Sequence, residues 1–181
     1  LLIKSGRYSK GYVNEEQLQS LKVLFRHKEN IKDQLKSLKR ETSSLLAVVF
    51  PELDKVIKDP YNVSGLILLD KYPTAKHFEN VTVKMILRLF RKTKGNNFNE
   101  AKAELLLSYS KDTIYSGVAK DARAFFIKSN VILIRALQEQ IKALENEMIK
   151  IFDKPINPEI TITKEDDDYI SSVLDNLRTI P

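Results

Sequence analysis

Five cations gather in one short stretch of this 181-residue chain, at spacings suited to contact with phosphates. They are Lys84, Arg88, Arg91, Lys92 and Lys94. The first four follow one another at i, i+4, i+7 and i+8, which places them on one face of a helix. No acid lies between Glu79 and Glu100 to neutralise them. This pattern predicts a nucleic-acid-binding face, and its alternative is the solvated basic face of an ordinary helix.

The remaining ionisable residues predict no catalytic residue and no metal site in this chain. His27 and His77 are the only histidines, and neither has carboxylates at ligand spacing. The acids from Glu165 to Asp168 are consecutive, so on a helix they point in different directions. We interpret them as acids in the first turn of a helix, where the dipole favours them. Because there is no cysteine and no glycine-rich phosphate loop, we expect no enzyme activity, no cofactor and no small-molecule substrate.

Composition and charge indicate the kind of partner and the cellular compartment. The formal net charge is +6 and the sequence pI is about 9.3, which favours a polyanionic partner. The absence of cysteine fits the reducing cytoplasm, and no apolar run approaches the ~18 residues of a membrane span, so no membrane partner is expected. The chain begins without Met, and we expect an excised fragment.

A long helix is predicted over residues 14–50, ending before Pro51. Its apolar residues alternate at intervals of three and four, as the contact positions of a coiled coil do. These seam positions are Leu21, Leu24, Ile31, Leu35, Leu38, Leu45 and Val49. Lys28 and Thr42 occupy two further places in the repeat and are its imperfect positions. The other cations of this helix have Glu29 and Asp33 among them at ion-pair spacing, which favours a solvated flank.

A second long helix is predicted over residues 119–152 with the same alternation. Its seam positions are Ile127, Asn130, Ile134, Leu137, Ile141, Leu144, Met148 and Ile151. Asn130 is a polar seam position, of the kind that specifies register at a cost in stability. If the two seams pair within one chain, the helices must be antiparallel. Pairing with the seams of another subunit is the open alternative.

The two long helices enclose a predicted helical head over residues 51–118. Within it we expect a helix over 65–71 capped by Ser64, one over 81–93, and one over 98–111 opened by a capping box of Asn97 and Glu100. Residues 1–13 form a lead-in, and 153–181 form a linker and a short helix. The predicted fold is therefore all-α: a long antiparallel coiled-coil hairpin (14–152) with a small helical head inserted between its helices.

Several landmarks, taken in order, resemble a known family. They are Leu1-Leu2 with Ser5-Gly6-Arg7 and Tyr12-Val13, then Phe50-Pro51-Glu52-Leu53, Leu69-Asp70-Lys71-Tyr72-Pro73-Thr74, Gln140-Ile141-Lys142-Ala143-Leu144-Glu145 and Leu177-Arg178-Thr179-Ile180-Pro181. The chain resembles the central coiled-coil region of the DEDD-type (RuvC-like) insertion-sequence transposases, the bridge-RNA-guided serine recombinases related to pilin-gene invertases. The likeness covers the chain nearly end to end.

This resemblance implies that the parent protein is a bacterial, cytoplasmic enzyme of DNA transposition. Its divalent metal would lie in a RuvC-like domain before Leu1, and its catalytic serine beyond Pro181. No catalytic residue carries over to this chain. The chain would be the spacer that pairs subunits, as a dimer, and contacts DNA and guide RNA. The alternative is a stand-alone helical scaffold or interaction protein with no nucleic-acid role.

Overall fold

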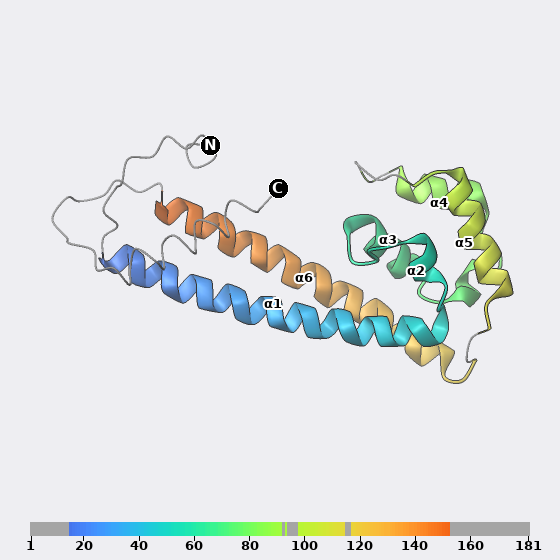
Figure 1. The fold of residues 1–181 in the computed structure, drawn as a ribbon, viewed down its shortest axis with the longest axis horizontal. Coiled ribbons are helices and arrows are strands. Elements are labelled where there is room, and N and C mark those ends of the chain that lie inside the picture. Colours follow the sequence, from blue (N-terminus) through green and yellow to red (C-terminus); the bar gives the residue numbers. More distant parts are fainter. Residues whose placement is uncertain (1–14, 92, 94–97, 115–116, 153–181) are drawn as a thin grey trace. The chain divides into compact units, whose positions relative to one another are not determined.

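The computed structural model describes residues 15–91, 93, 98–114 and 117–152, and every regular element among them is helical. The prediction of an all-α fold is confirmed. The predicted lead-in (1–13) and the predicted linker and short helix (153–181) lie outside the described residues. In chain order the elements are α1, α2, α3, the 3-10 helix η1, α4, α5 and α6 (Figure 1).

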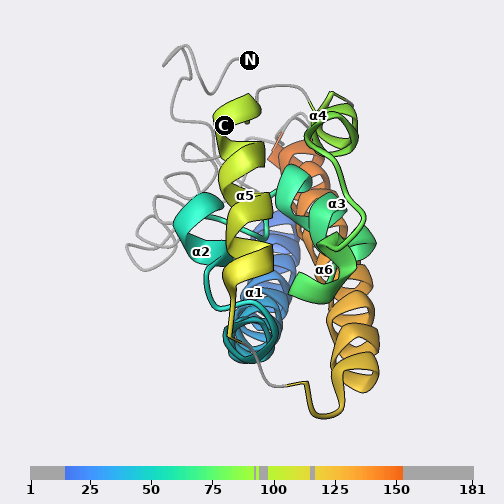
Figure 2. The same cartoon turned by 90° about the vertical axis from the view of Figure 1, so that its right-hand side faces the viewer.

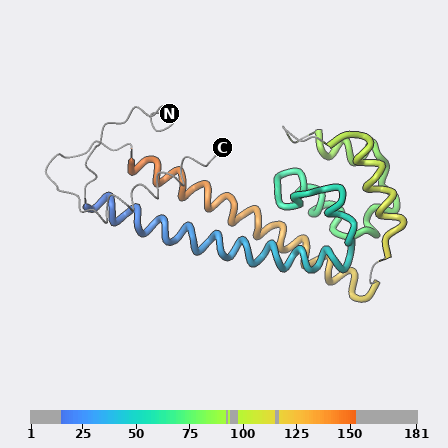
Figure 3. Tube along the Cα trace, viewed as in Figure 1, coloured from blue at the N-terminus to red at the C-terminus, as the bar shows by residue number. Residues whose placement is uncertain are grey.

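Among the described residues, two long helices stand before and after five short ones in chain order. The long helices are α1 (Glu15–Val49) and α6 (Lys120–Phe152), each an uninterrupted coil in Figure 3. The short ones are α2 (Leu53–Val56), α3 (Val63–Lys71), η1 (Ala75–Phe78), α4 (Val83–Phe90) and α5 (Glu100–Asp112). Helix α1 ends just before Phe50-Pro51, because proline has no N–H to donate and its ring clashes with the preceding turn.

The chain forms two compact units. The terminal unit comprises Leu1–Asp33 and Glu139–Pro181, and the central unit comprises Gln34–Gln138. In the terminal unit, Leu21 of α1 and Met148 of α6 are buried together, and Leu24, Phe25, Ile151 and Phe152 pack around them. Lys28 lies further along α1 and meets Glu145, which lies earlier on α6. The two helices are therefore antiparallel in this unit.

The central unit holds the larger core. Phe50, Tyr72 and Phe78 form an aromatic group in it, with ring centroids 5.6 Å apart for Phe50–Phe78 and 5.0 Å for Tyr72–Phe78. Ile127 and Ile134 of α6 are fully buried in the same core. Helix α5 packs on α2, η1 and α4, and α3 packs on α4 (Figure 2). These contacts give the short helices fixed places within the unit.

Three of the predicted helix starts are corrected. Asn62, not Ser64, caps α3, and its side chain accepts a hydrogen bond from the backbone N–H of Gly65 at 2.8 Å. Asn99, not Asn97, caps α5 by accepting from the N–H of Lys102 at 3.0 Å. The helix predicted over 81–93 covers only Val83–Phe90, and Thr82 caps its start. Several Asn, Ser and Thr residues compete for each cap, and the tertiary contacts select among them.

None of the predicted seam positions is exposed in the structure. The buried ones are Leu21, Ile31, Val49, Ile127, Asn130, Ile134 and Met148. The half-buried ones are Leu24, Leu35, Leu38, Leu45, Leu137, Ile141, Leu144 and Ile151. The two imperfect places are buried as well, with Lys28 1% and Thr42 0% exposed.

Candidate nucleic-acid interface

Helix α4 is a short, strongly amphipathic helix held against the core of the central unit. Thr82 caps its start, and Ile86 and Phe90 are buried beneath it. The ring of Phe90 stacks on Phe98, which leads into α5, with centroids 4.1 Å apart. Just beyond α4, the hydroxyl of Ser64 on α3 donates to Thr93 Oγ1 at 2.9 Å. These contacts hold the apolar side of α4 against the core, so the opposite side of the helix faces solvent.

Three of the five predicted cations lie on or directly after α4, and all three are exposed. Lys84 and Arg88 lie one turn apart on the helix, and Arg91 is its C-cap residue. None of the three forms an ion pair with a carboxylate among the residues that the structure describes. Lys92 and Lys94 lie outside the described residues. The face thus presents exposed, unneutralised positive charge.

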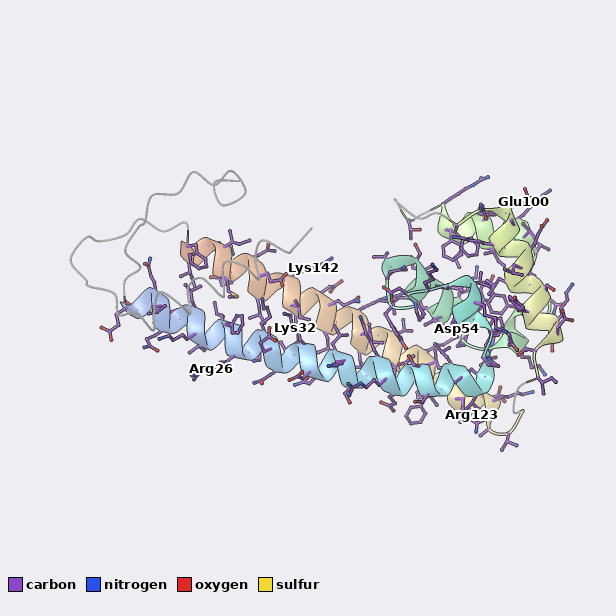
Figure 4. All side chains as sticks on the ribbon, viewed as in Figure 1. Arg26, Lys32, Asp54, Glu100, Arg123 and Lys142 are labelled. Atoms are coloured by element: carbon purple, nitrogen blue, oxygen red, sulfur yellow. The ribbon has the colours of Figure 1, made fainter. Side chains whose placement is uncertain are left out.

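The three exposed cations differ in how the dipole of α4 acts on them. Arg88 and Arg91 lie at the C-terminal end of α4, where the helix dipole stabilises cations. Lys84 lies in the first turn, where the dipole disfavours a cation. Helix stability therefore explains the two arginines but not the lysine. The nearest acid that follows in the chain is Glu100, labelled at the start of α5 in Figure 4.

The cations of α1 include one that is paired with an acid and three that are exposed like those of α4. Lys32 is paired with Glu29 on the same helix, with 2.9 Å between Nζ and Oε1, as expected of a solvated flank. Arg26, labelled in Figure 4, is exposed, as are Lys36 and Arg40. These three exposed cations match the α4 set in number and type, and so provide a control surface.

Lys28, an imperfect position of the predicted seam, is buried beside an acid, and the sequence did not reveal that partner. Its side chain is 1% exposed and its Nζ lies 3.8 Å from Oε1 of Glu145. Burial lowers the pKa of Lys28, the neighbouring charge of Lys32 lowers it further, and Glu145 and Glu29 oppose the shift. The heptad spacing of Lys28 was the available signal, because a residue in a seam register is buried whatever its type.

The two histidines have packing or surface positions. His77 follows the cap of η1, and its Nδ1 lies 2.7 Å from the hydroxyl of Thr74. Burial lowers the pKa of His77, and the charge of Lys128 adds to the shift. His27 is exposed on α1. The part of the chain that the structure describes contains no group of three His, Asp or Glu residues able to hold a metal ion. The acids Glu165–Asp168 lie outside it.

A hollow of about 340 Å³ opens beside the end of α1. Its lining includes Ser43, Phe50, Asp54, Lys58 and Tyr61. Burial raises the pKa of Tyr61, whose hydroxyl donates to the carbonyl of Lys39 at 2.7 Å and lies 2.5 Å from Ser43 Oγ. The hydroxyl thus anchors the loop before α3 onto α1. The hydroxyl of Tyr61 at this hollow therefore has a structural role.

No described helix combines the length and the apolar character that crossing a membrane requires. Neither the family models, nor the curated proteins, nor the solved structures gave a match to this chain. The function proposed below is therefore inferred from the chain's own residues.

Proposed function

We propose that this chain is the assembly and nucleic-acid-contacting spacer module of a bacterial, cytoplasmic DNA transposase or recombinase. The observation that carries the nucleic-acid role is the exposed face of Lys84, Arg88 and Arg91, with Lys84 at a place where helix stability disfavours a cation. The ordered landmarks of the sequence support the transposase assignment. By the same resemblance, the divalent metal and the catalytic serine would belong to domains outside this chain.

The alternative is a helical scaffold without a nucleic-acid role. What favours it is the exposed apolar surface on α6, where Phe125 and Ile132 are 72% and 62% exposed. Such a surface is typical of contacts between proteins rather than with phosphates. The two roles differ in their dependence on salt, which makes them separable by experiment.

The test compares two triple variants of the full chain, each of which replaces three exposed cations with glutamate. The first is Lys84→Glu, Arg88→Glu and Arg91→Glu, and the matched control is Arg26→Glu, Lys36→Glu and Arg40→Glu. Binding to labelled duplex DNA and to a structured RNA is measured by fluorescence anisotropy across a salt series.

We expect the α4 variant to lose affinity and its salt slope to fall by roughly one for each phosphate contact removed. The control should stay closer to the unmodified chain. An α4 variant that binds as tightly as the unmodified chain would contradict the proposal. Equal losses in both variants would show that net charge, not the α4 face, governs binding.

A further inference from the structure

The side of α6 that points away from the central core is apolar and exposed. Phe125 and Phe126 are 72% and 53% exposed, and Ile132 and Leu133 are 62% and 50% exposed. At 3.6 residues per turn, all four lie within an arc of about 120°. On the other side of the same stretch, Ile127 and Ile134 are fully buried. This part of α6 therefore has two apolar sides, of which the core covers one.

The exposed side carries no charge. Ala122 and Ala136, both exposed, and the half-buried Ser129 lie between the four large residues, and none of the residues in the arc is charged. Isolated exposed apolar residues are ordinary, whereas four large ones on two successive turns form a patch. A helix that is apolar all round is normally buried all round. We call the residues of 122–136 in this arc the outer face of α6.

The order of residues on the outer face is self-complementary. Counting outward from Ser129 in either direction, large apolar residues stand three and four places away, and alanine stands seven places away. Two copies packed antiparallel about an axis at Ser129 would thus set Phe125 opposite Leu133, Phe126 opposite Ile132, and Ala122 opposite Ala136. A two-fold interface requires this property, because one patch must fit itself.

We propose that the outer face of α6 pairs with the same face of a second copy of this chain, about a two-fold axis at Ser129. This deepens the assembly role proposed above by naming its surface and its partner, and it does not depend on nucleic acid. Lys128 is exposed beside the axis, and its long side chain can extend into water at the rim.

The exposed area decides the strength of this contact. At roughly 200 Å² for each phenylalanine, the two rings expose about 250 Å² in each copy. Two copies would bury on the order of 500 Å² from these rings alone, whereas a standard stable interface buries roughly 1,200–2,000 Å² in total. We therefore expect a reversible dimer whose population depends on concentration.

The small residue at the axis gives a geometric test. Helices that cross at small residues approach to an axial distance of roughly 8–10 Å, which leaves about 3.4–5.4 Å between the two Cα atoms at the crossing. A disulfide needs a Cα separation of roughly 4.4–6.8 Å. Because the chain has no cysteine, Ser129→Cys introduces a single thiol per copy.

Under mild oxidation we expect Ser129→Cys to form a covalent dimer. Ala122→Cys should not form one alone, because its partner across the axis is Ala136, but a mixture of Ala122→Cys and Ala136→Cys chains should form the mixed dimer. Val23→Cys is the control, since it places a more accessible thiol on α1, where Val23 is 64% exposed and Ser129 is half-buried. Cross-linking of Ser129→Cys no greater than that of Val23→Cys would overturn the two-fold arrangement.

Light scattering on a sizing column, over a tenfold range of concentration, tests the interface without cysteine. We expect the mass of the unmodified chain to rise from 20.8 kDa toward that of two copies. Phe125→Glu with Ile132→Glu should weaken dimerisation by roughly tenfold or more, because each contact would bury unpaired charge. Val23→Glu should not weaken it, and circular dichroism checks that each variant remains helical.

Two results would overturn the proposal. An unmodified chain that is monomeric at every concentration would assign the outer face to another occupant. A Phe125→Glu, Ile132→Glu variant that dimerises as the unmodified chain does would place the contact elsewhere. The α4 triple variant should remain dimeric while losing nucleic acid, so failure of this inference and failure of the nucleic-acid role give different results.

Discussion

Asn130 of α6 donates a hydrogen bond from Nδ2 to Oγ1 of Thr42 on α1, at 3.2 Å, and both side chains are buried. The Thr42 hydroxyl in turn donates to the carbonyl of Leu38 at 2.8 Å. Two polar residues that interrupt the apolar repeats of separate helices thus satisfy each other inside the central unit. Any other register of α1 against α6 would leave both without this partner, so the pair specifies the register.

Removing one member of this pair should therefore lower the free energy of unfolding by more than its contact area suggests. We expect Asn130→Ala to lower the free energy of unfolding by ~1–3 kcal/mol, because it leaves Thr42 without a donor and opens a cavity. In a Thr42→Val background the same change should cost less, by ~0.5–1.5 kcal/mol. Urea denaturation of the four chains measures both values. Additive losses would contradict a direct coupling.

Lys28 should reduce stability at neutral pH. Since burial lowers its pKa, the folded chain binds this proton less tightly than the unfolded chain does. Stability should therefore rise with pH, from the lowered folded pKa up to the ordinary value of 10.5. Lys28→Met should be more stable than the unmodified chain near pH 7, because a flexible apolar side chain fills the same space without a buried charge.

The pH dependence is measured by urea denaturation between pH 7 and pH 10. The stability difference between the two chains should shrink as pH rises, because Lys28 loses its charge. Glu145→Gln is the companion variant, and it should destabilise the chain by ~1–3 kcal/mol at pH 7, because it removes the partner of a buried charge. A difference that stays constant with pH would contradict a shifted pKa.

Gly65 should not tolerate alanine, although alanine favours helices. A Cβ at this position would lie 2.6 Å from the carbonyl carbon of Pro60, and that backbone atom cannot rotate away. We expect Gly65→Ala to lower the free energy of unfolding by ~1–3 kcal/mol despite the ~1 kcal/mol that alanine gains in a helix. Gly117→Ala is the matched control, since a Cβ there has open space, and thermal unfolding should show little change. Equal melting temperatures for both variants would refute the steric argument.

Ala119 should be improved by glycine. It precedes α6 with φ at 52°, in the left-handed region that costs a Cβ-bearing residue ~1–2 kcal/mol. Its carbonyl accepts from the N–H of Arg123 at 3.0 Å, which holds it in the first turn. Ala119→Gly should raise the melting temperature, whereas Ala143→Gly, at an exposed place within α6, should lower it through a loss of ~1 kcal/mol. A fall in both variants would show that Ala119 bears no strain.

Much of the helical layout was predictable because periodicity is a local property. The three-and-four spacing predicted α1 and α6 to within one residue at each end, and Pro51 marked the end of the first. The buried stripe of α4 follows the same rule, because Ile86 and Phe90 lie one turn apart and are both buried. The caps were less predictable, because Asn62 and Ser64 offer similar side-chain oxygens two residues apart.

The sequence by itself determined that the chain is helical, where its long helices run, and which residues occupy the repeats, because spacing along a helix sets which side chains share a face. Only the tertiary structure decided that the side of α6 opposite its seam, with Phe125 and Ile132, is left exposed, because apolar residues outside the repeat do not reveal whether another helix covers them. It also decided that Lys28 is buried beside Glu145 and that Asn130 meets Thr42. Such contacts join residues far apart in the chain, and they exist only once the helices pack.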